Sequence, residues 1–214
     1  MKLYTYFRSS AAYRVRIALN LKGLEAELIP LDLLKDGGEQ FGAEYDALNP
    51  YHLVPLLEDD GMLSTQSLAI IEYLDETNPG NPLLPSTPRA RARVRALSQV
   101  IACDIHPLNN LRVLKYLKRK LNVSSEQKDE WYRHWISLGL EALERQLVRD
   151  PETGLFCHGD TPTMADCCLV PQLYNARKFD CDLTRYPALV AIAARCDDLS
   201  AFDDARPQKQ QDAH

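Results

Sequence analysis

Four prolines between Asn78 and Pro88 divide the sequence into two parts with different patterns. Proline lacks a backbone donor and disfavours the helical conformation at the residue before it, so this segment continues neither a helix nor a sheet. Before the segment, short alternating apolar runs occur between helical patterns, whereas the spacing after it is helical almost throughout. We therefore predict an α/β domain over residues 1–80, a linker, and an all-helical domain over residues 89–206.

The first part is predicted to fold in the order βαβ-ββα, with alternating runs as strands and 3.6-residue spacing as helices. The strands are expected at residues 2–7, 26–33, 56–57 and 62–64, and the helices are expected to end at Gly23 and to cover residues 65–74. Pro30 favours an edge position for the second strand, because proline cannot donate to a ladder. An acidic turn at residues 58–61 joins the last two strands into a hairpin.

The second part is predicted to contain only helices. They are expected at residues 89–105, 109–121, 125–148, 167–176 and 186–198. Thr163 and Asp166 have the spacing of a capping box for the apolar fourth helix, which indicates a structural role for both. Residues 207–214 are polar and lack apolar anchors, so we expect a flexible tail.

Composition excludes several classes of function. The 214 residues carry a net charge of −5 and give a pI near 5.6, which argues against nucleic acid as a partner. No run approaches the roughly 18 apolar residues of a membrane span, and no secretion signal is recognised, so we expect a cytoplasmic protein with no membrane partner.

The six cysteines also indicate a reduced compartment, because they are scattered and form no C-x-x-C pair. The missing pair disfavours a thioredoxin-like redox role. Cys103 and His106 are three residues apart and could share a helix face, but two ligands do not make a zinc site, so no metal is expected.

Two helix N-termini in the first part carry side chains suited to an anionic ligand. Ser9 and Ser10 stand between the first strand and its helix, and Gln66 and Ser67 begin the last helix of this part. Unpaired N–H groups and the helix dipole make such a terminus favourable for an anion or a thiolate. Ser10 acting only as an N-cap is the ordinary alternative.

Two further groups could bind the same ligand. The Val54–Pro55 bond can be cis, which would leave the Val54 backbone to pair with a ligand, although an edge-strand proline is the simpler explanation. Gln40 follows a flexible Gly37-Gly38 turn and could hydrogen-bond a peptide-like molecule. We therefore expect one ligand site in the first domain.

The motifs together resemble a known family. In order along the chain they are S-S-A-A-Y-R-V-R-I-A-L, L-N-P-Y-H-L-V-P, T-Q-S-L-A-I-I-E-Y-L and G-D-T-P-T-M-A-D-C-C-L-V-P-Q. Each string is weak alone, but the set resembles the zeta class of cytosolic glutathione transferases from Met1 to about Phe202. The resemblance implies a thioredoxin-like N-terminal domain, an all-α C-terminal domain and a homodimer.

The resemblance also implies a glutathione site. It places Ser9 and Ser10 beside the thiol, the Val54 backbone against the cysteinyl unit, and Gln66 with Ser67 at the γ-glutamyl end. The further contacts that it implies are Gln40, His106, Asn110, Leu111 and Arg112. Ala11 departs from the pattern, because zeta sequences often have cysteine there, and Tyr13 stands where tryptophan is common. The implied chemistry needs only the thiol of glutathione itself.

The implied activity is the cis–trans isomerisation of maleylacetoacetate to fumarylacetoacetate in aromatic amino acid catabolism. A serine donor and a helix N-terminus would stabilise the thiolate, and cationic side chains would hold the dicarboxylate substrate. Arg8 adjoins the serines and is the first candidate; Arg112, Arg177 and Lys178 are the candidates of the helical domain. An arginine is usual where Lys178 aligns, so Arg177 and Lys178 both stay open.

Three alternatives remain from the sequence. Maleylpyruvate could be the substrate in place of maleylacetoacetate. The protein could instead be a glutathione-conjugating transferase or dehalogenase, which would consume the thiol. It could also be a binding or structural protein that uses the same fold without catalysis.

Overall fold

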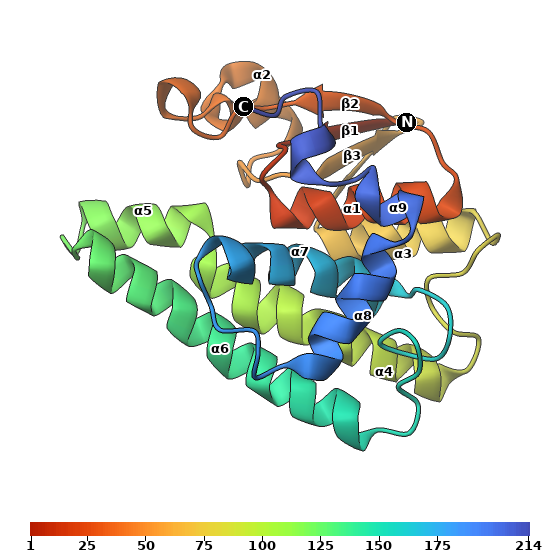
Figure 1. The fold of residues 1–214 in the computed structure, drawn as a ribbon. Helices are drawn as coiled ribbons and strands as arrows, with labels where there is room; N and C mark the ends of the chain where they lie inside the picture. Colours follow the sequence, from red (N-terminus) through yellow and green to blue (C-terminus); the bar gives the residue numbers. More distant parts are fainter. The chain divides into compact units, whose positions relative to one another are not determined.

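The computed structural model describes all residues, Met1–His214, and forms two compact units (Figure 1). The first unit combines Met1–Leu84 with Asp197–His214, and the second unit is Pro85–Cys196. The chain passes from the first unit to the second between Leu84 and Pro85, and a boundary near residue 80 was expected. The expected helical domain extended to residue 206, whereas the structure returns the chain to the first unit at Asp197.

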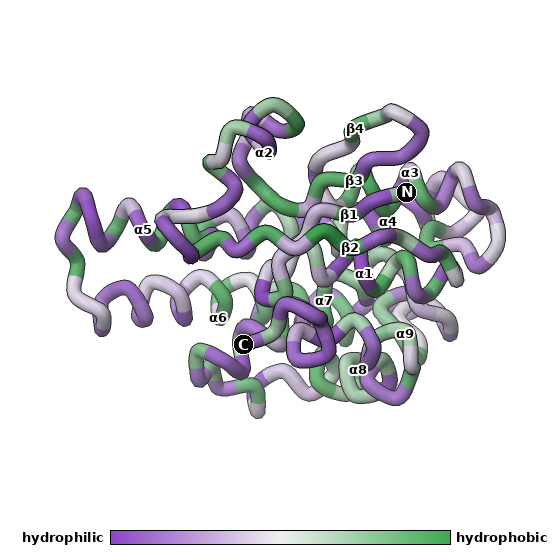
Figure 2. The backbone as a smooth tube through the Cα atoms, turned by 90° about the horizontal axis from the view of Figure 1, so that it is seen from above, coloured by the Kyte–Doolittle hydropathy of each residue, from purple (hydrophilic) through white to green (hydrophobic).

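The first unit is built on a four-stranded mixed sheet in the order β2-β1-β3-β4. The strands are β1 (Lys2–Thr5), β2 (Glu27–Pro30), β3 (Leu56–Asp59) and β4 (Met62–Thr65). β1 is parallel to β2 and antiparallel to β3, and β3 and β4 form a hairpin. Figure 2 shows the turn of this hairpin in the purple of hydrophilic residues. Strand β2 with its proline lies at the edge, as predicted.

Helices complete the first unit. They are α1 (Ser10–Lys22), α2 (Ala43–Leu48), α3 (Ser67–Thr77) and the short α9 (Ser200–Asp203), with 3₁₀ turns η1 (Lys35–Gly37), η2 (Glu39–Phe41) and η5 (Pro207–Lys209). α1 packs against α3, and both lie along one face of the sheet (Figure 1). Val15, Ile17 and Ile70 are fully buried there, so apolar burial fixes this face.

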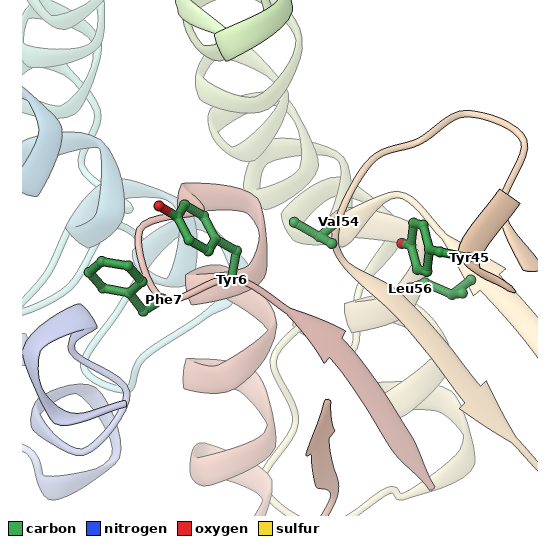
Figure 3. Close-up of a cluster of buried hydrophobic side chains, with 5 residues drawn as sticks. All are labelled: Tyr6, Phe7, Tyr45, Val54 and Leu56. Carbon is green, nitrogen blue, oxygen red and sulfur yellow. The ribbon is translucent and has the colours of Figure 1, made fainter. Parts of the chain in front are cut away.

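A smaller apolar cluster lies where the sheet meets α2. Its buried members are Tyr6, Phe7, Tyr45, Val54 and Leu56. Figure 3 shows Val54 between Tyr6 on one side and the pair Tyr45 and Leu56 on the other in that view. The Tyr45 hydroxyl donates to the Leu53 carbonyl oxygen at 2.6 Å, which anchors the segment that leads into β3.

The segment expected to be a flexible tail is instead part of the first unit. The Asp212 carboxylate accepts a hydrogen bond of 2.9 Å from the Phe7 backbone N–H, and the Gln211 side chain donates to the Leu28 carbonyl oxygen at 3.0 Å. Besides the buried Pro207, polar side chains attach it. This is why composition alone did not reveal the contact.

The regular elements of the second unit are all helical. Its elements are α4 (Pro88–Gln99), the π-helical η3 (Val100–Ile105), the 3₁₀ turn η4 (His106–Asn109), α5 (Leu111–Arg119), α6 (Ser125–Arg149), α7 (Met164–Lys178) and α8 (Pro187–Asp197). The expected helix over residues 89–105 therefore changes form at Val100, ahead of Pro107, which cannot continue an α-helical ladder. The predicted thioredoxin-like and all-helical fold class is confirmed.

The capping box at the start of α7 is present as predicted, and the helix begins three residues earlier than expected. The buried Asp166 carboxylate accepts from the Thr163 backbone N–H at 2.7 Å and from the Cys157 backbone N–H at 2.9 Å. The box thus satisfies two donors at once, one of them in the preceding loop.

Candidate functional site

The sheet register brings the three expected ligand-binding segments of the first unit to the same end of the strands. Tyr4 pairs with Leu56, and Leu56 pairs with Thr65, so these residues form one row across β1, β3 and β4. The loop after β1, the residues before β3 and the residues after β4 all leave the sheet beyond this row. Ser9, Val54 and Gln66 belong to those three segments.

The loop after β1 carries Arg8, Ser9 and Ser10. Ser9 is the N-cap of α1, and its hydroxyl oxygen accepts from the Ala12 backbone N–H at 3.2 Å. Ser10 is the first residue of the helix and is buried. Ser9, and not Ser10, therefore has the N-cap role that was the ordinary alternative for Ser10. Arg8 is exposed, and its guanidinium carbon lies 5.8 Å from the centre of the Phe7 ring.

The start of α3 has an unusual backbone. Gln66 caps this helix with φ 70° and ψ 113°, in the region that favours glycine. Such a conformation costs about 1–3 kcal/mol in a non-glycine residue and is frequent at ligand sites. Ser67 is buried and accepts a hydrogen bond of 3.1 Å from the Arg14 guanidinium. Arg14, on α1, therefore joins the two helix N-termini.

Val54 and Gln40 complete the set of expected residues in this unit. The Val54–Pro55 peptide bond is cis, and Val54 is buried immediately before β3. Gln40 lies in η2 with only 5% of its surface exposed, and its carbonyl oxygen Oε1 has no hydrogen-bond partner. Since buried polar atoms are normally satisfied, this oxygen indicates a missing donor.

These groups fit glutathione chemically. The peptide offers amide donors to a buried carbonyl oxygen such as Gln40 Oε1, and its carboxylates suit helix N-termini. No group of three or more histidine, cysteine, aspartate or glutamate side chains is placed to hold a metal ion. All six cysteines are free.

The remaining expected residues lie in the second unit. Asn110 is the N-cap of α5, and its side-chain oxygen accepts from the Arg112 backbone N–H at 3.1 Å. His106 opens η4 and Leu111 opens α5. Arg112 is exposed, and Arg177 and Lys178 form the exposed end of α7. Helices η4, α5 and α7 therefore carry the second group of candidates.

Two residues near the loop were missed by sequence reasoning as site residues. The bond from Arg14 to Ser67 depends on the packing of α1 against α3, which no local pattern in the sequence shows. Asp212 lies 205 positions from its partner Phe7, and no periodicity connects the two. The one available signal for Arg14 was the presence of arginine among mostly apolar residues of the predicted helix.

Comparison with known proteins defines the class. A family model described as the N-terminal domain of glutathione S-transferase matches residues 8–77, and one for the C-terminal domain matches residues 136–202. The chain belongs to the glutathione S-transferase family. Within it, the resemblance to the zeta class is confirmed by relatives that are named as isomerases.

Three relatives show how close the likeness is. A probable maleylacetoacetate isomerase of Vibrio cholerae is 53% identical over 211 residues, covering 99% of this chain and 97% of that protein. The holo structure of a bacterial zeta-class maleylpyruvate isomerase superposes with a TM-score of 0.97 at 45% identity, and each chain is fully covered. A maleylacetoacetate isomerase of Methylobacterium extorquens, solved with bound malonate and glutathione, gives 0.96 at 44% identity over both full chains.

Proposed function

We propose that this protein is a glutathione-dependent enzyme that isomerises maleylacetoacetate to fumarylacetoacetate. The observation that carries the proposal is the row formed by Tyr4, Leu56 and Thr65 across three strands. Beyond this row, at the same end of the strands, lie the loop with Ser9 and Ser10, the Val54 segment and the strained Gln66. The proposal is further supported by relatives of nearly equal length that are named for this reaction.

The residues of the first unit would hold glutathione. Ser10 and Ser9, at the N-terminus of α1, would donate to the thiolate and stabilise its charge. The Val54 backbone would pair with the cysteinyl unit. Gln66 and Ser67 would hold the γ-glutamyl end, with Arg14 orienting the Ser67 hydroxyl.

Gln40 Oε1 would accept from a further peptide N–H of glutathione, which would satisfy this buried oxygen. His106, Asn110, Leu111 and Arg112 are the contacts proposed from the second unit. Because the Asn110 oxygen already caps α5, its contact would be made by the amide nitrogen.

When bound, glutathione supplies a nucleophilic sulfur that adds reversibly to the double bond of the substrate, so that rotation about the resulting single bond becomes possible. The chain must hold the substrate carboxylates while this happens. Arg8 is proposed for one carboxylate, because it is exposed beside Ser9. Arg112, Arg177 and Lys178 are proposed for the other, and guanidinium groups bind carboxylates with paired hydrogen bonds.

The first test is an ultraviolet assay with maleylacetoacetate and glutathione at a small fraction of the substrate concentration. We expect complete conversion with all glutathione recovered. Stoichiometric loss of the thiol would instead support the conjugating transferase or dehalogenase, and no turnover at all would support the non-catalytic alternative. Parallel assays with maleylpyruvate decide between the two isomerase substrates.

The second test concerns the serines. Ser10→Ala should lower kcat about 10²–10³-fold, the usual effect of removing one donor from a developing anion. Ser9→Ala should also destabilise the protein by about 0.5–2 kcal/mol, because it removes a helix cap. Ser86→Ala, an exposed serine of the linker, is the matched control. Unchanged glutathione affinity and rate in both loop variants would refute the assignment of the loop.

We also propose that the protein is a cytoplasmic homodimer. None of its helices is both long and apolar enough to cross a membrane. The six free thiols support a reducing compartment. Gel filtration should give about twice the chain mass of 24.3 kDa, and elution at the mass of one chain would exclude the dimer.

A further inference from the structure

The last residues of the chain lie against the loop that carries the proposed catalytic serines. We call residues 205–214 the C-terminal strap. Its Asp212 carboxylate accepts from the Phe7 backbone N–H at 2.9 Å. The His214 ring lies 4.9 Å from the Phe7 ring, at an interplanar angle of 55°. Gln211 donates to the Leu28 carbonyl oxygen of the edge strand β2, away from the loop.

A buried arginine joins the strap to the same loop. Arg16 is 3% exposed, and its Nε donates to the Ala205 carbonyl oxygen at 3.2 Å. Its two terminal nitrogens reach the end of β1 and the loop: Nη1 donates to Thr5 Oγ1 at 3.0 Å, and Nη2 donates to the Phe7 carbonyl oxygen at 3.1 Å. Burial lowers the pKa of Arg16 to about 10, so the guanidinium stays charged at neutral pH.

Both backbone polar groups of Phe7 are therefore held by the strap or by a residue bonded to it. The N–H is bound by Asp212, and the carbonyl oxygen by Arg16. Strand β1 ends at Thr5, so the Phe7 N–H has no strand partner there, and its acceptor is the Asp212 carboxylate. The peptide plane of Phe7 sets the direction in which the chain continues into Arg8, Ser9 and Ser10.

We propose that Asp212 is a positioning residue for the isomerase reaction: by binding the Phe7 N–H, it fixes the loop that presents Arg8, Ser9 and Ser10. The proposal rests on the proposed function. In this role Asp212 acts on the loop through the Phe7 backbone. The negative charge of Asp212 would by itself oppose thiolate formation, so its benefit is geometric. Removing the charge alone should lower the pKa of the glutathione thiol. Losing the geometry of the serine donors should raise it.

Two substitutions separate these effects. Asp212→Ala removes both the acceptor and the charge, whereas Asp212→Asn removes the charge and keeps an oxygen that can accept from Phe7. Gln211→Ala is the matched control, since it removes a strap contact that does not involve the loop. We measure kcat, KM for glutathione, and the pKa of the bound thiol from its ultraviolet absorbance as a function of pH.

Asp212→Ala should lower kcat about 10- to 100-fold, because small misplacements of catalytic groups have effects of this size. It should also raise the thiol pKa. Asp212→Asn should recover most of the rate, and Gln211→Ala should stay within about twofold of the unsubstituted protein. A normal rate in Asp212→Ala, or an equal defect in Asp212→Asn with a lowered thiol pKa, would overturn the proposal.

Amide hydrogen exchange provides a readout that does not depend on the reaction. In the full chain, Asp212→Ala should accelerate exchange in residues 7–12 and leave α7 unchanged, while Gln211→Ala should not affect residues 7–12. Unaltered exchange there would overturn the positioning role even if the protein proves to have another activity. Absence of isomerase activity in the unsubstituted protein would refute the proposed function alone.

Discussion

The Lys22 ammonium lies 2.9 Å from the Asp75 carboxylate, and their side chains are only 0% and 6% exposed. Asp75 also accepts from the backbone N–H groups of Leu83 and Leu84. Lys22 donates to the carbonyl oxygens of Gly80 and Asn81 as well. One buried ion pair therefore joins α1 and α3 to residues 80–84 of the proline-rich segment.

Breaking this pair should be costly. Asp75→Ala should lower the free energy of unfolding by about 3–5 kcal/mol, since it leaves a buried ammonium without its counter-charge. Urea denaturation measures the effect. Lys35→Ala is the control, because the Lys35–Glu39 pair is exposed to solvent and exposed ion pairs contribute little to stability. A loss for Asp75→Ala no larger than for the control would contradict the assigned role.

Gly38→Ala should weaken glutathione binding. A Cβ at Gly38 would lie 2.5 Å from both terminal atoms of the Gln40 side chain, so Gln40 must move away from its present position. We expect KM for glutathione to rise several-fold, corresponding to roughly 1 kcal/mol for one hydrogen bond, with kcat little changed.

Gly37→Ala provides the control for the backbone. Gly37 and Gly38 both have positive φ, at 94° and 126°, so alanine strains the chain at either position. A Cβ at Gly37 meets nothing within 4 Å. If the two variants raise KM equally, backbone strain explains the effect and Gln40 does not.

The acid stability of the second unit should depend on Asp150. The hydrogen bond from Arg93 Nε, 2.7 Å long, lowers the pKa of Asp150 below its ordinary value of 3.8, and a backbone bond from Glu152 adds to the shift. A depressed carboxyl pKa stabilises the fold at pH values above 3.8, and this contribution is lost as the pH falls through the lower folded value.

Asp150→Asn should therefore be less stable at neutral pH and should lose less stability between about pH 4 and pH 2 than the unsubstituted protein. Thermal or urea unfolding at a series of pH values gives both slopes. Parallel curves for the two proteins would show that Arg93 does not stabilise the ionised carboxylate.

Local signals predicted much of the fold. The alternation of residues 2–7 and the serines that follow indicated the β1–α1 junction, because strand pairing and helix capping depend on neighbouring residues. The box formed by Thr163 and Asp166 was recognised for the same reason. The sequence could not show which serine caps α1, since Ser9 and Ser10 are both good N-cap residues and only the backbone angles distinguish them.

A change of helix type and two long-range contacts escaped prediction. The helix expected over residues 89–105 changes to a π-helix at Val100, although its apolar spacing continues unbroken. The bonds from Arg14 to Ser67 and from Phe7 to Asp212 cross 53 and 205 positions of sequence. Such pairs form only after helices pack, and the polar composition of residues 207–214 resembles that of an unattached tail.

The first unit is built from two segments, residues 1–84 and 197–214, that are far apart in the sequence, and this has a consequence during synthesis. A ribosome releases residues 1–84 long before residues 197–214, so the sheet and its helices emerge while the acceptor for the Phe7 N–H does not yet exist. Domains usually fold in the order in which they are made. Here the first unit can complete its contacts only after all of the second unit has been made.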